Sequence, residues 1–171
     1  TRTIGMVYRA SSDQRVVDYG MLEQSAQDTE DAQALENAQT LVYNLCKEDY
    51  EILLRIVEAE AGGEDEDGKL LVANVVLNRV NHEDFPDTVS EVVMQKSHGI
   101  TQFSPVSSGR IWKVSVSDET VKAVGRALAG EDISQGALYF AARKYADSEN
   151  MKWFDENLTF LFSHGGHEFY L

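Results

Sequence analysis

A single acidic residue stands within an apolar stripe of a helix that is predicted to end at Gly62-Gly63. On a helical wheel at about 100° per residue, Glu60 falls in the middle of that stripe. Glu58 falls on the opposite face, which we expect to meet solvent. The stripe is formed by four residues, Ile52, Leu53, Ile56 and Val57. The pattern therefore directs one glutamate toward the interior and its neighbour toward water.

A carboxyl group in apolar surroundings is costly to ionise, so we expect the pKa of Glu60 to be raised. A glutamic acid that stays protonated near neutral pH can donate a proton during a reaction. Glu60 is therefore the candidate catalytic residue. The alternative is that Glu60, at the end of its helix, turns out to water and has no part in chemistry.

The charge of the chain excludes several kinds of partner. The 171 residues carry a net charge of −14 and contain no basic cluster that could neutralise phosphates. We therefore expect no binding to nucleic acid and no adhesion to anionic membranes. No apolar run reaches about 18 residues, so no membrane span is predicted. The length is that of one domain with a proper core.

Other catalytic and metal-binding arrangements lack the residues that they need. The single cysteine, Cys46, excludes an internal disulfide, and its apolar neighbours predict a buried structural thiol rather than a nucleophile. His164 and His167 flank a glycine turn, but a zinc site would need a third ligand at a known spacing. No Gly-x-Ser-x-Gly sequence and no glycine-rich phosphate loop occur. We expect neither a metal nor a cofactor.

An acidic run at 64–67 precedes the most apolar segment of the chain. Its spacing does not match a calcium-binding EF-hand loop, so we favour a helix N-terminus, where acids interact with the helix dipole. The helix that follows, over 69–81, is apolar nearly all round and is predicted to be central and buried. Asn74 and Asn78 share one face of this helix and should hold loops across the core, while Arg79 should pair with a carboxylate.

The remaining elements predict an α+β fold. Thr3–Arg9 forms either a strand or a floppy arm, and 96–117 reads as a long loop, which in a compact domain is usually a binding element. Because helices are followed by strands along the chain, the two kinds of element should segregate. Helices are predicted at 30–45, 88–95 and 117–128, and strands at 137–140, 158–163 and 167–170, the last two as a hairpin.

Polar and aromatic side chains in the second half of the chain indicate a surface that binds sugars. One buried acid accompanied by amide and aromatic groups is typical of a glycan site, although tryptophan and tyrosine also serve as core residues. The candidate substrate-binding residues are Gln102, Phe103, Ser104, Tyr139, Trp153 and His167.

Six segments together resemble the catalytic domains of spore cortex-lytic enzymes and cell-wall hydrolases of spore-forming bacteria. They occur in that family's order and spacing and cover about residues 50–171. The segments are Glu60–Glu64, Val72–Val80, Phe85–Thr88, Gln102–Val106 with Gly109, Gly136–Phe140 and His167–Tyr170.

The resemblance implies a lysozyme-like α+β fold with a helical core and a small antiparallel β-sheet. It also implies cleavage of the peptidoglycan bond between N-acetylmuramic acid and N-acetylglucosamine. Glu60 matches the family's catalytic glutamate, and Gln102 and Tyr139 match positions that line the cleft. Gly62 and the segment 141–143 depart from the family's pattern, which leaves the sugar subsites open, including any preference for muramic lactam.

We therefore predict a lytic transglycosylase that uses Glu60 alone, because the glycines should turn Glu64, the nearest second carboxylate, away. The alternatives are a muramidase-type hydrolase with a second carboxylate, a non-catalytic glycan-binding module and an acidic intracellular interaction domain. The catalytic domain is predicted at 46–171, with 1–45 as an N-terminal arm or helix outside the resemblance. We expect a processed, monomeric protein that acts on glycan strands outside the cell, in the cell wall or spore envelope.

Overall fold

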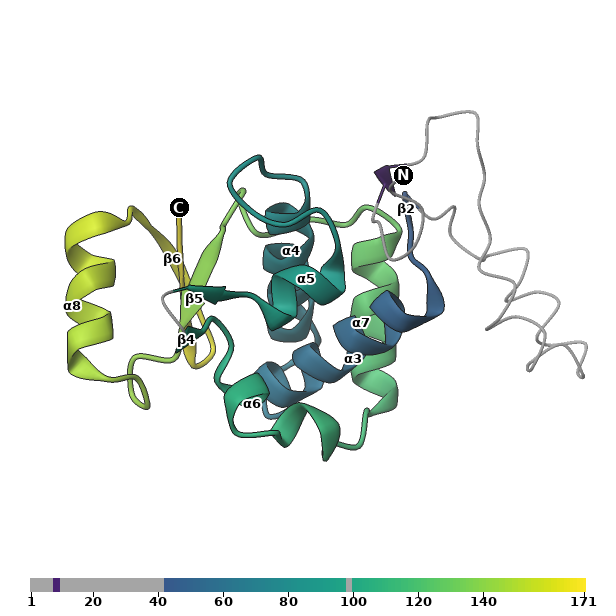
Figure 1. Cartoon of the computed structure of the whole chain (residues 1–171), viewed down its shortest axis with the longest axis horizontal. Helices are drawn as coiled ribbons and strands as arrows, with labels where there is room; N and C mark the ends of the chain where they lie inside the picture. The colour runs from purple at the N-terminus through teal and green to yellow at the C-terminus, as the bar shows by residue number, and fades with distance from the viewer. Residues whose placement is uncertain (1–7, 10–41, 98–99) are drawn as a thin grey trace, which may run out of the picture.

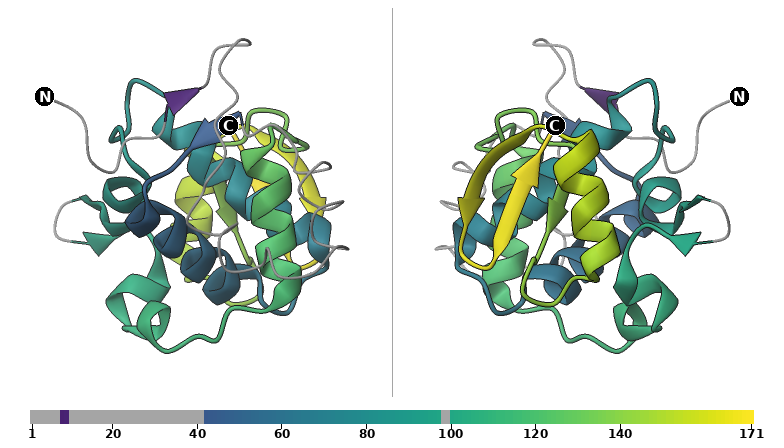
Figure 2. Two further views of the ribbon diagram at one scale, coloured as in Figure 1. Left: turned by 90° about the vertical axis from the view of Figure 1, so that its right-hand side faces the viewer. Right: turned by 90° about the vertical axis from the view of Figure 1, so that its left-hand side faces the viewer.

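The computed structural model describes residues 8–9, 42–97 and 100–171 of the chain. All helices but one pack together into one body. The remaining helix, α8 (Ser148–Asn157), lies beside them with a three-stranded antiparallel sheet (Figure 1). The right-hand view of Figure 2 looks onto this sheet and α8, with the other helices behind. The predicted α+β class is confirmed.

The central helix of the bundle is buried nearly all round, as its continuous apolar sequence predicts. This helix, α4, packs against the three other principal helices, and 12 of its 15 residues are buried. These four principal helices are α3 (Lys47–Ala61), α4 (Glu66–Val80), α5 (Val89–Met94) and α7 (Asp118–Leu128). None of the helices in the described residues has the length and apolar character needed to span a bilayer.

Three helices begin at side chains that the sequence marks as caps. The carboxylate of Asp65 accepts a hydrogen bond from Gly68 N at 2.8 Å, so the acidic run lies at the N-terminus of α4 as predicted. Thr88 and Glu91 form the predicted capping box, with Glu91 N donating to Thr88 Oγ1 at 3.1 Å. Ser117 caps α7 in the same way.

The prediction for the start of the domain is partly wrong. Cys46 is half-buried rather than buried, because its Sγ caps α3 by accepting from Asp49 N at 3.5 Å. The helix predicted over 30–45 does not reach its expected end, since β2 (Tyr43–Asn44) pairs there with β1 (Tyr8–Arg9). Pairing with a distant strand overrides the local helical pattern. The rest of that predicted helix, and most of the predicted first strand, lie outside the described residues.

The sheet has the strand order β5-β7-β6 and contains the predicted hairpin. Its turn includes Gly165 in the left-handed region, at φ 54°. The strands are β5 (Tyr139–Ala141), β6 (Phe160–His164) and β7 (His167–Tyr170).

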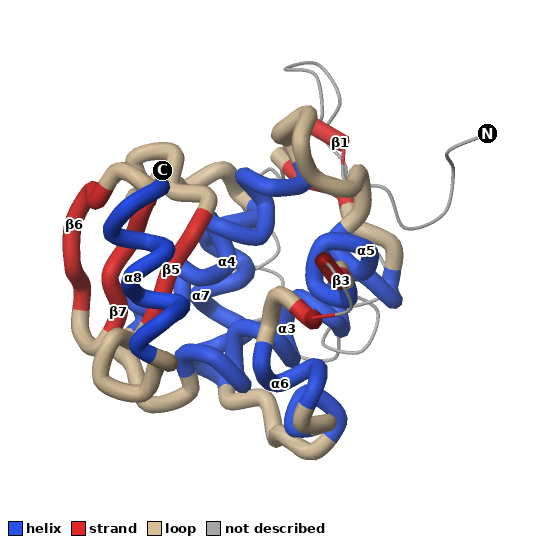
Figure 3. Tube along the Cα trace, turned by 60° about the vertical axis from the view of Figure 1, so that its left-hand side comes forward, coloured by secondary structure: helices blue, strands red, loops and turns tan. Residues whose placement is uncertain are grey.

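Helix α8 runs alongside the sheet (Figure 3) and was not predicted. Its Phe154 ring meets Tyr139 of β5 and Tyr170 of β7 at centroid distances of 6.1 and 5.2 Å. Met151 is its one fully buried residue. A helix held by so few residues leaves no apolar stripe in the sequence, which explains why the pattern missed it.

The segment predicted as one long loop contains short elements instead. Strands β3 and β4 pair with each other, and α6 and η1 pack against α3. Each element is four residues or shorter, which is below the length at which apolar periodicity can be read. The elements are β3 (Lys96–Ser97), β4 (Ile100–Thr101), α6 (Ser104–Ser107) and the 3₁₀ helix η1 (Arg110–Trp112).

The two amides of α4 hold the loop between α7 and β5, as predicted. Asn74 donates to Glu131 O at 2.9 Å and accepts from Ile133 N at 3.1 Å. Asn78 donates to Ala137 O at 2.9 Å. These bonds satisfy buried amide groups and fix the approach of the chain to the sheet.

Candidate active site

Glu60 lies in the last turn of α3, on the same side as the buried residues of that helix. Ile56, one turn earlier, has no exposed surface, and Glu60 itself is half-buried. Burial raises the pKa of Glu60 to about 7, against a smaller opposing effect of the Arg110 charge. The upward shift that the helical wheel predicts is therefore confirmed. At neutral pH a large fraction of these carboxyl groups carries a proton.

Glu58 is partly exposed, as the wheel predicts, but its carboxylate is hydrogen-bonded within the protein. Its Oε2 accepts hydrogen bonds from Ser117 N at 3.4 Å, from Ser117 Oγ at 3.2 Å and from Thr120 Oγ1. Glu58 therefore ties the end of α3 to the first turn of α7, where an anion also interacts well with the helix dipole. A side chain at Gly62 would come within 2.6 Å of Glu58 O, so the turn after Glu60 requires glycine there.

Glu64 is engaged by the hairpin between β6 and β7. Its Oε1 accepts from Gly166 N at 3.1 Å and lies 3.9 Å from His167 Nδ1. A side chain at Gly165 would overlap the other oxygen of Glu64, so the approach of turn and hairpin depends on glycine. This arrangement directs the carboxylate of Glu64 toward the sheet.

A second contact joins the same two turns. His164 Nε2 lies 2.7 Å from Asp65 Oδ1, and this hydrogen bond lowers the pKa of the Asp65 carboxyl. Of the two histidines that flank the glycine turn, His164 is hydrogen-bonded to an acid, whereas His167 Nδ1 is buried near Glu64 without a hydrogen bond. In the part of the chain that the structure describes, no three His, Cys, Asp or Glu side chains gather to hold a metal ion.

Arg110, which the sequence analysis did not single out, lies beside Glu60. Its Nη2 donates to the carbonyl of Ala59 at 2.7 Å, and Arg55 Nη1 donates to Ile111 O at 3.4 Å. With Ile111 fully buried, these bonds fasten η1 to the C-terminal half of α3. A lone arginine in a Gly/Ser-rich stretch is the one signal that could have identified it.

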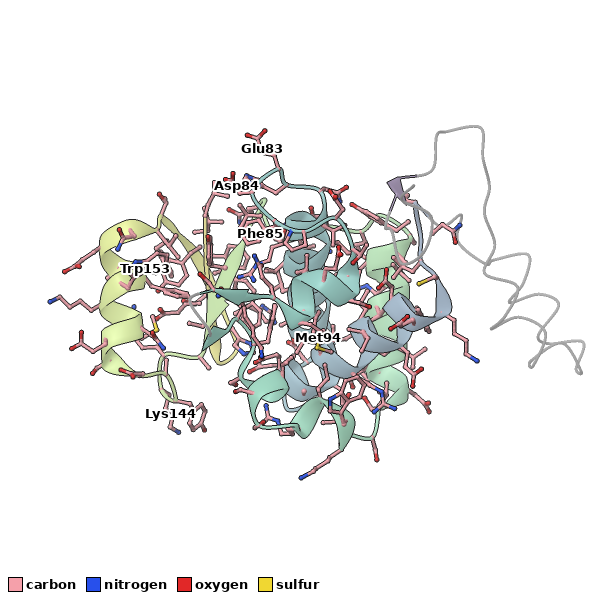
Figure 4. The ribbon with its side chains drawn as sticks, in the orientation of Figure 1. Glu83, Asp84, Phe85, Met94, Lys144 and Trp153 are labelled. Atoms are coloured by element: carbon pink, nitrogen blue, oxygen red, sulfur yellow. The ribbon has the colours of Figure 1, made fainter. Side chains whose placement is uncertain are left out.

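Arg79 is buried among aromatic rings rather than paired with a carboxylate, so that prediction is wrong. Its guanidinium lies 5.0, 5.2 and 5.1 Å from the ring centroids of Phe85, Phe103 and Tyr139. Its Nε donates to Leu138 O at 2.7 Å, and burial lowers its pKa to about 10. Figure 4 shows Phe85 near β5, where this cluster joins the helices to the sheet.

The six predicted substrate-binding residues differ in their exposure. Gln102 and Ser104 are exposed at the start of α6, whereas Phe103 between them is 3% exposed. Tyr139 is half-buried and Trp153 is 48% exposed. The remaining residue, His167, is 5% exposed in β7, and burial lowers its pKa.

The structure connects these residues through aromatic contacts. Phe103 and Tyr139 both contact the Arg79 guanidinium. The ring centroids of Trp153 and Tyr139 lie 6.4 Å apart. The Phe140 ring lies between those of Phe103 and His167, with centroid distances of 6.1 and 5.3 Å. The buried members present little surface to a ligand, while Trp153 projects from α8 (Figure 4).

Two of the cavities in the described structure lie away from Glu60. One lies beside Tyr43, His82 and Leu171, and the other beside Arg143 and Lys152. The assignment of the candidate site rests on the burial and the neighbours of Glu60.

Comparison with known proteins gives a family match and several similar enzymes. Residues 63–170 match the family described as cell wall hydrolase. The spore cortex-lytic enzyme of Oceanobacillus iheyensis is 39% identical over 92 residues, which are 54% of this chain and 32% of that protein. That of Halalkalibacterium halodurans is 36% identical over 119 residues, 68% of this chain and 34% of that protein. The chain thus spans about a third of the length of these relatives.

Two solved structures are similar in fold. The catalytic domain of the germination-specific lytic transglycosylase SleB from Bacillus anthracis has a TM-score of 0.65 and 30% identity, covering 75% of this chain and 98% of that one. The catalytic domain of the Bacillus cereus SleB protein has a TM-score of 0.61 and 29% identity, covering 75% and 93%. These matches confirm the predicted fold, and the family match over residues 63–170 shows that the chain belongs to the cell wall hydrolase family.

Proposed function

We propose that this chain cleaves peptidoglycan at the bond between N-acetylmuramic acid and N-acetylglucosamine, as a lytic transglycosylase with Glu60 as its single acid and base. Its family membership and its likeness to the SleB catalytic domain support this activity. The observation that carries the assignment of Glu60 is its burial, which raises its pKa to about 7. We place the catalytic unit at 46–171 and its site of action in the cell wall or spore envelope.

The reaction begins with the protonated form of Glu60. Its proton passes to the glycosidic oxygen, the bond from that oxygen to C1 of the muramic acid breaks, and positive charge develops at C1. The resulting Glu60 carboxylate then takes the proton of the 6-hydroxyl of the same sugar, whose oxygen bonds to C1. The products are a new chain end and a 1,6-anhydro sugar, with no water consumed.

The placement of Glu64 favours this single-acid route over hydrolysis with a second carboxylate. Its oxygens are directed to Gly166 N and His167 at the hairpin. In the alternative, a muramidase-type hydrolase, a second carboxylate and a water molecule complete the reaction. A non-catalytic glycan-binding module with the same fold would bind the strand and leave it intact.

Purified sacculi distinguish these possibilities. The wild-type chain should release muropeptides that end in an anhydro sugar, which are lighter by one water than hydrolysis products in mass spectrometry. Glu60→Gln should release none while keeping the circular dichroism spectrum of the fold. Glu48→Gln, an exposed position on the same helix, is the matched control and should cut normally. Products that carry the extra water would point to the hydrolase, and binding without release would point to the glycan-binding module.

A further inference from the structure

Arg110 presents a positive charge beside the candidate acid, with no ion-pair partner in the described part of the chain. Its side chain is exposed, and one nitrogen, Nη2, is held by the carbonyl of Ala59, the residue before Glu60. No carboxylate within the described residues forms an ion pair with it, yet its charge lowers the pKa of Glu60. Arg110 therefore lies close enough to Glu60 to act electrostatically, without being neutralised by it.

Four other arginines whose side chains the structure describes are engaged within the protein. Arg55, Arg126 and Arg143 each pair with at least one acid, at 3.1, 2.9 and 2.7 Å. Arg79 is buried against three aromatic rings. In a chain whose net charge is −14, acids are plentiful, yet the exposed Arg110 guanidinium remains available to an external anion.

The backbone around Arg110 is fixed, which favours a binding role over a mobile surface charge. Gly109 adopts φ 74°, a conformation open to glycine, and turns the chain into η1. Arg110 N donates to Ser108 Oγ at 3.3 Å, and the next residue, Ile111, is fully buried. Among the described residues the guanidinium makes a single hydrogen bond, which leaves further donors in the planar arrangement that matches a carboxylate.

The proposed substrate carries such a carboxylate on the sugar that reacts. Muramic acid bears a lactyl group on C3, two ring carbons from the C1 at which the bond breaks. The lactyl carboxyl is either free or joined to a stem peptide, which brings carboxylates of its own. In the lactam form of muramic acid, the carboxyl group is consumed and no charge remains.

We propose that Arg110 is a specificity-determining residue that binds a carboxylate carried by the muramic acid unit next to the cleaved bond. This inference rests on the proposed function. Arg110 then favours strands whose muramic acid is charged over strands in which the carboxyl is capped or closed to a lactam. Pairing with the substrate carboxylate also offsets the positive charge that opposes protonation of Glu60, so the proton donor is strengthened when the right strand is bound.

Two forms of one substrate test the proposal. Glycan strands stripped of peptide by an amidase carry free lactyl carboxylates, and coupling with methylamine caps the same groups as neutral amides. Wild-type kcat/KM should be about 5- to 10-fold higher on the free strands, as expected for a partly exposed charge-assisted pair. Arg110→Gln should lower kcat/KM on the free strands and bring the ratio close to one.

Lys113→Gln is the matched control, because Lys113 is an exposed cation that follows η1 directly. It should keep the wild-type ratio. An unchanged ratio in Arg110→Gln, an equal fall in both variants, or faster cutting of lactam-rich strands by the wild type would overturn the proposal. Strands that retain their peptides, tested in the same way, show whether the lactyl or the peptide carboxylate is the partner.

Binding separates this inference from the proposed function. In the Glu60→Gln background, calorimetry with free and capped strands should show the same 5- to 10-fold preference, which Arg110→Gln removes. If the wild type cuts no strand, the proposed function fails, while the binding preference still decides whether Arg110 recognises the carboxylate. If strands are cut and bound without any preference, the proposed function stands and this inference fails.

Discussion

Glu58 and Glu60 lie two residues apart on one helix and have opposite surroundings. Glu58 accepts hydrogen bonds from Ser117 and Thr120 at the start of α7. Glu60 faces the apolar side of α3, with Arg110 as a charge nearby and no hydrogen bond to its carboxyl within the described chain. Donors stabilise a carboxylate, whereas burial without them favours the protonated acid. The same residue type therefore serves structure at one position and is suited to proton transfer at the other.

The largest expected contrast is in activity. Glu60→Gln should lower kcat on sacculi by about 10²- to 10⁴-fold, the usual contribution of a general acid. Glu58→Gln should keep most of the activity, because it removes a structural carboxylate. Turbidity loss of a sacculus suspension measures both. If the two variants lose activity equally, the division of roles between the glutamates is wrong.

The pH dependence of stability provides the next test. Because the folded-state pKa of Glu60 is raised from 4.5 to about 7, the folded protein binds its proton more tightly than the unfolded chain does. This stabilisation is complete below pH 4.5 and is lost as the pH rises through about 7. The loss amounts to at most about 3 kcal/mol.

Glu60→Gln removes this titration. Urea unfolding should therefore show the variant gaining stability relative to the wild type between pH 5 and pH 8. Activity of the wild type should fall over the same range as the acid loses its proton. An identical pH dependence in both proteins would show that Glu60 is not the buried acid.

Loss of the Glu58 contacts should destabilise the fold by a smaller amount. Glu58→Gln leaves Ser117 and Thr120 with a neutral partner and should reduce the free energy of unfolding by about 1–2 kcal/mol. Chemical denaturation at pH 8 measures it. Adding Thr120→Val to Glu58→Gln should then cause little further loss of stability, since both changes disrupt the same hydrogen-bond network. Full additivity would indicate that the three residues do not act together.

The smallest effect concerns the charge next to Glu60. Arg110→Gln should raise the pKa of Glu60 further, because the guanidinium opposes the effect of burial. The alkaline limb of the kcat/KM profile, which reports the free enzyme, should move to higher pH by a fraction of a unit, and Lys113→Gln should leave it in place. A shift to lower pH would contradict the assigned sign of the interaction.

Local sequence patterns predicted much of the scaffold and the position of the acid. The apolar stripe identified Glu60, the continuous apolar run identified α4, and the amides Asn74 and Asn78 were correctly expected to hold loops. The hairpin of β6 and β7 followed from two strand-like segments with glycines between them. Each of these features depends on neighbours within a few residues, which is the range that periodicity reports.

The tertiary structure alone decided which distant groups meet. Glu58 reaches Thr120 across 62 positions, and Arg110 reaches Ala59 across 51. Arg79 contacts three aromatic rings from separate segments, although a carboxylate partner was expected. The sequence determines that a buried polar group must have a partner, because leaving it unpaired is costly. The choice of partner depends on how the elements pack, and no local pattern contains that information.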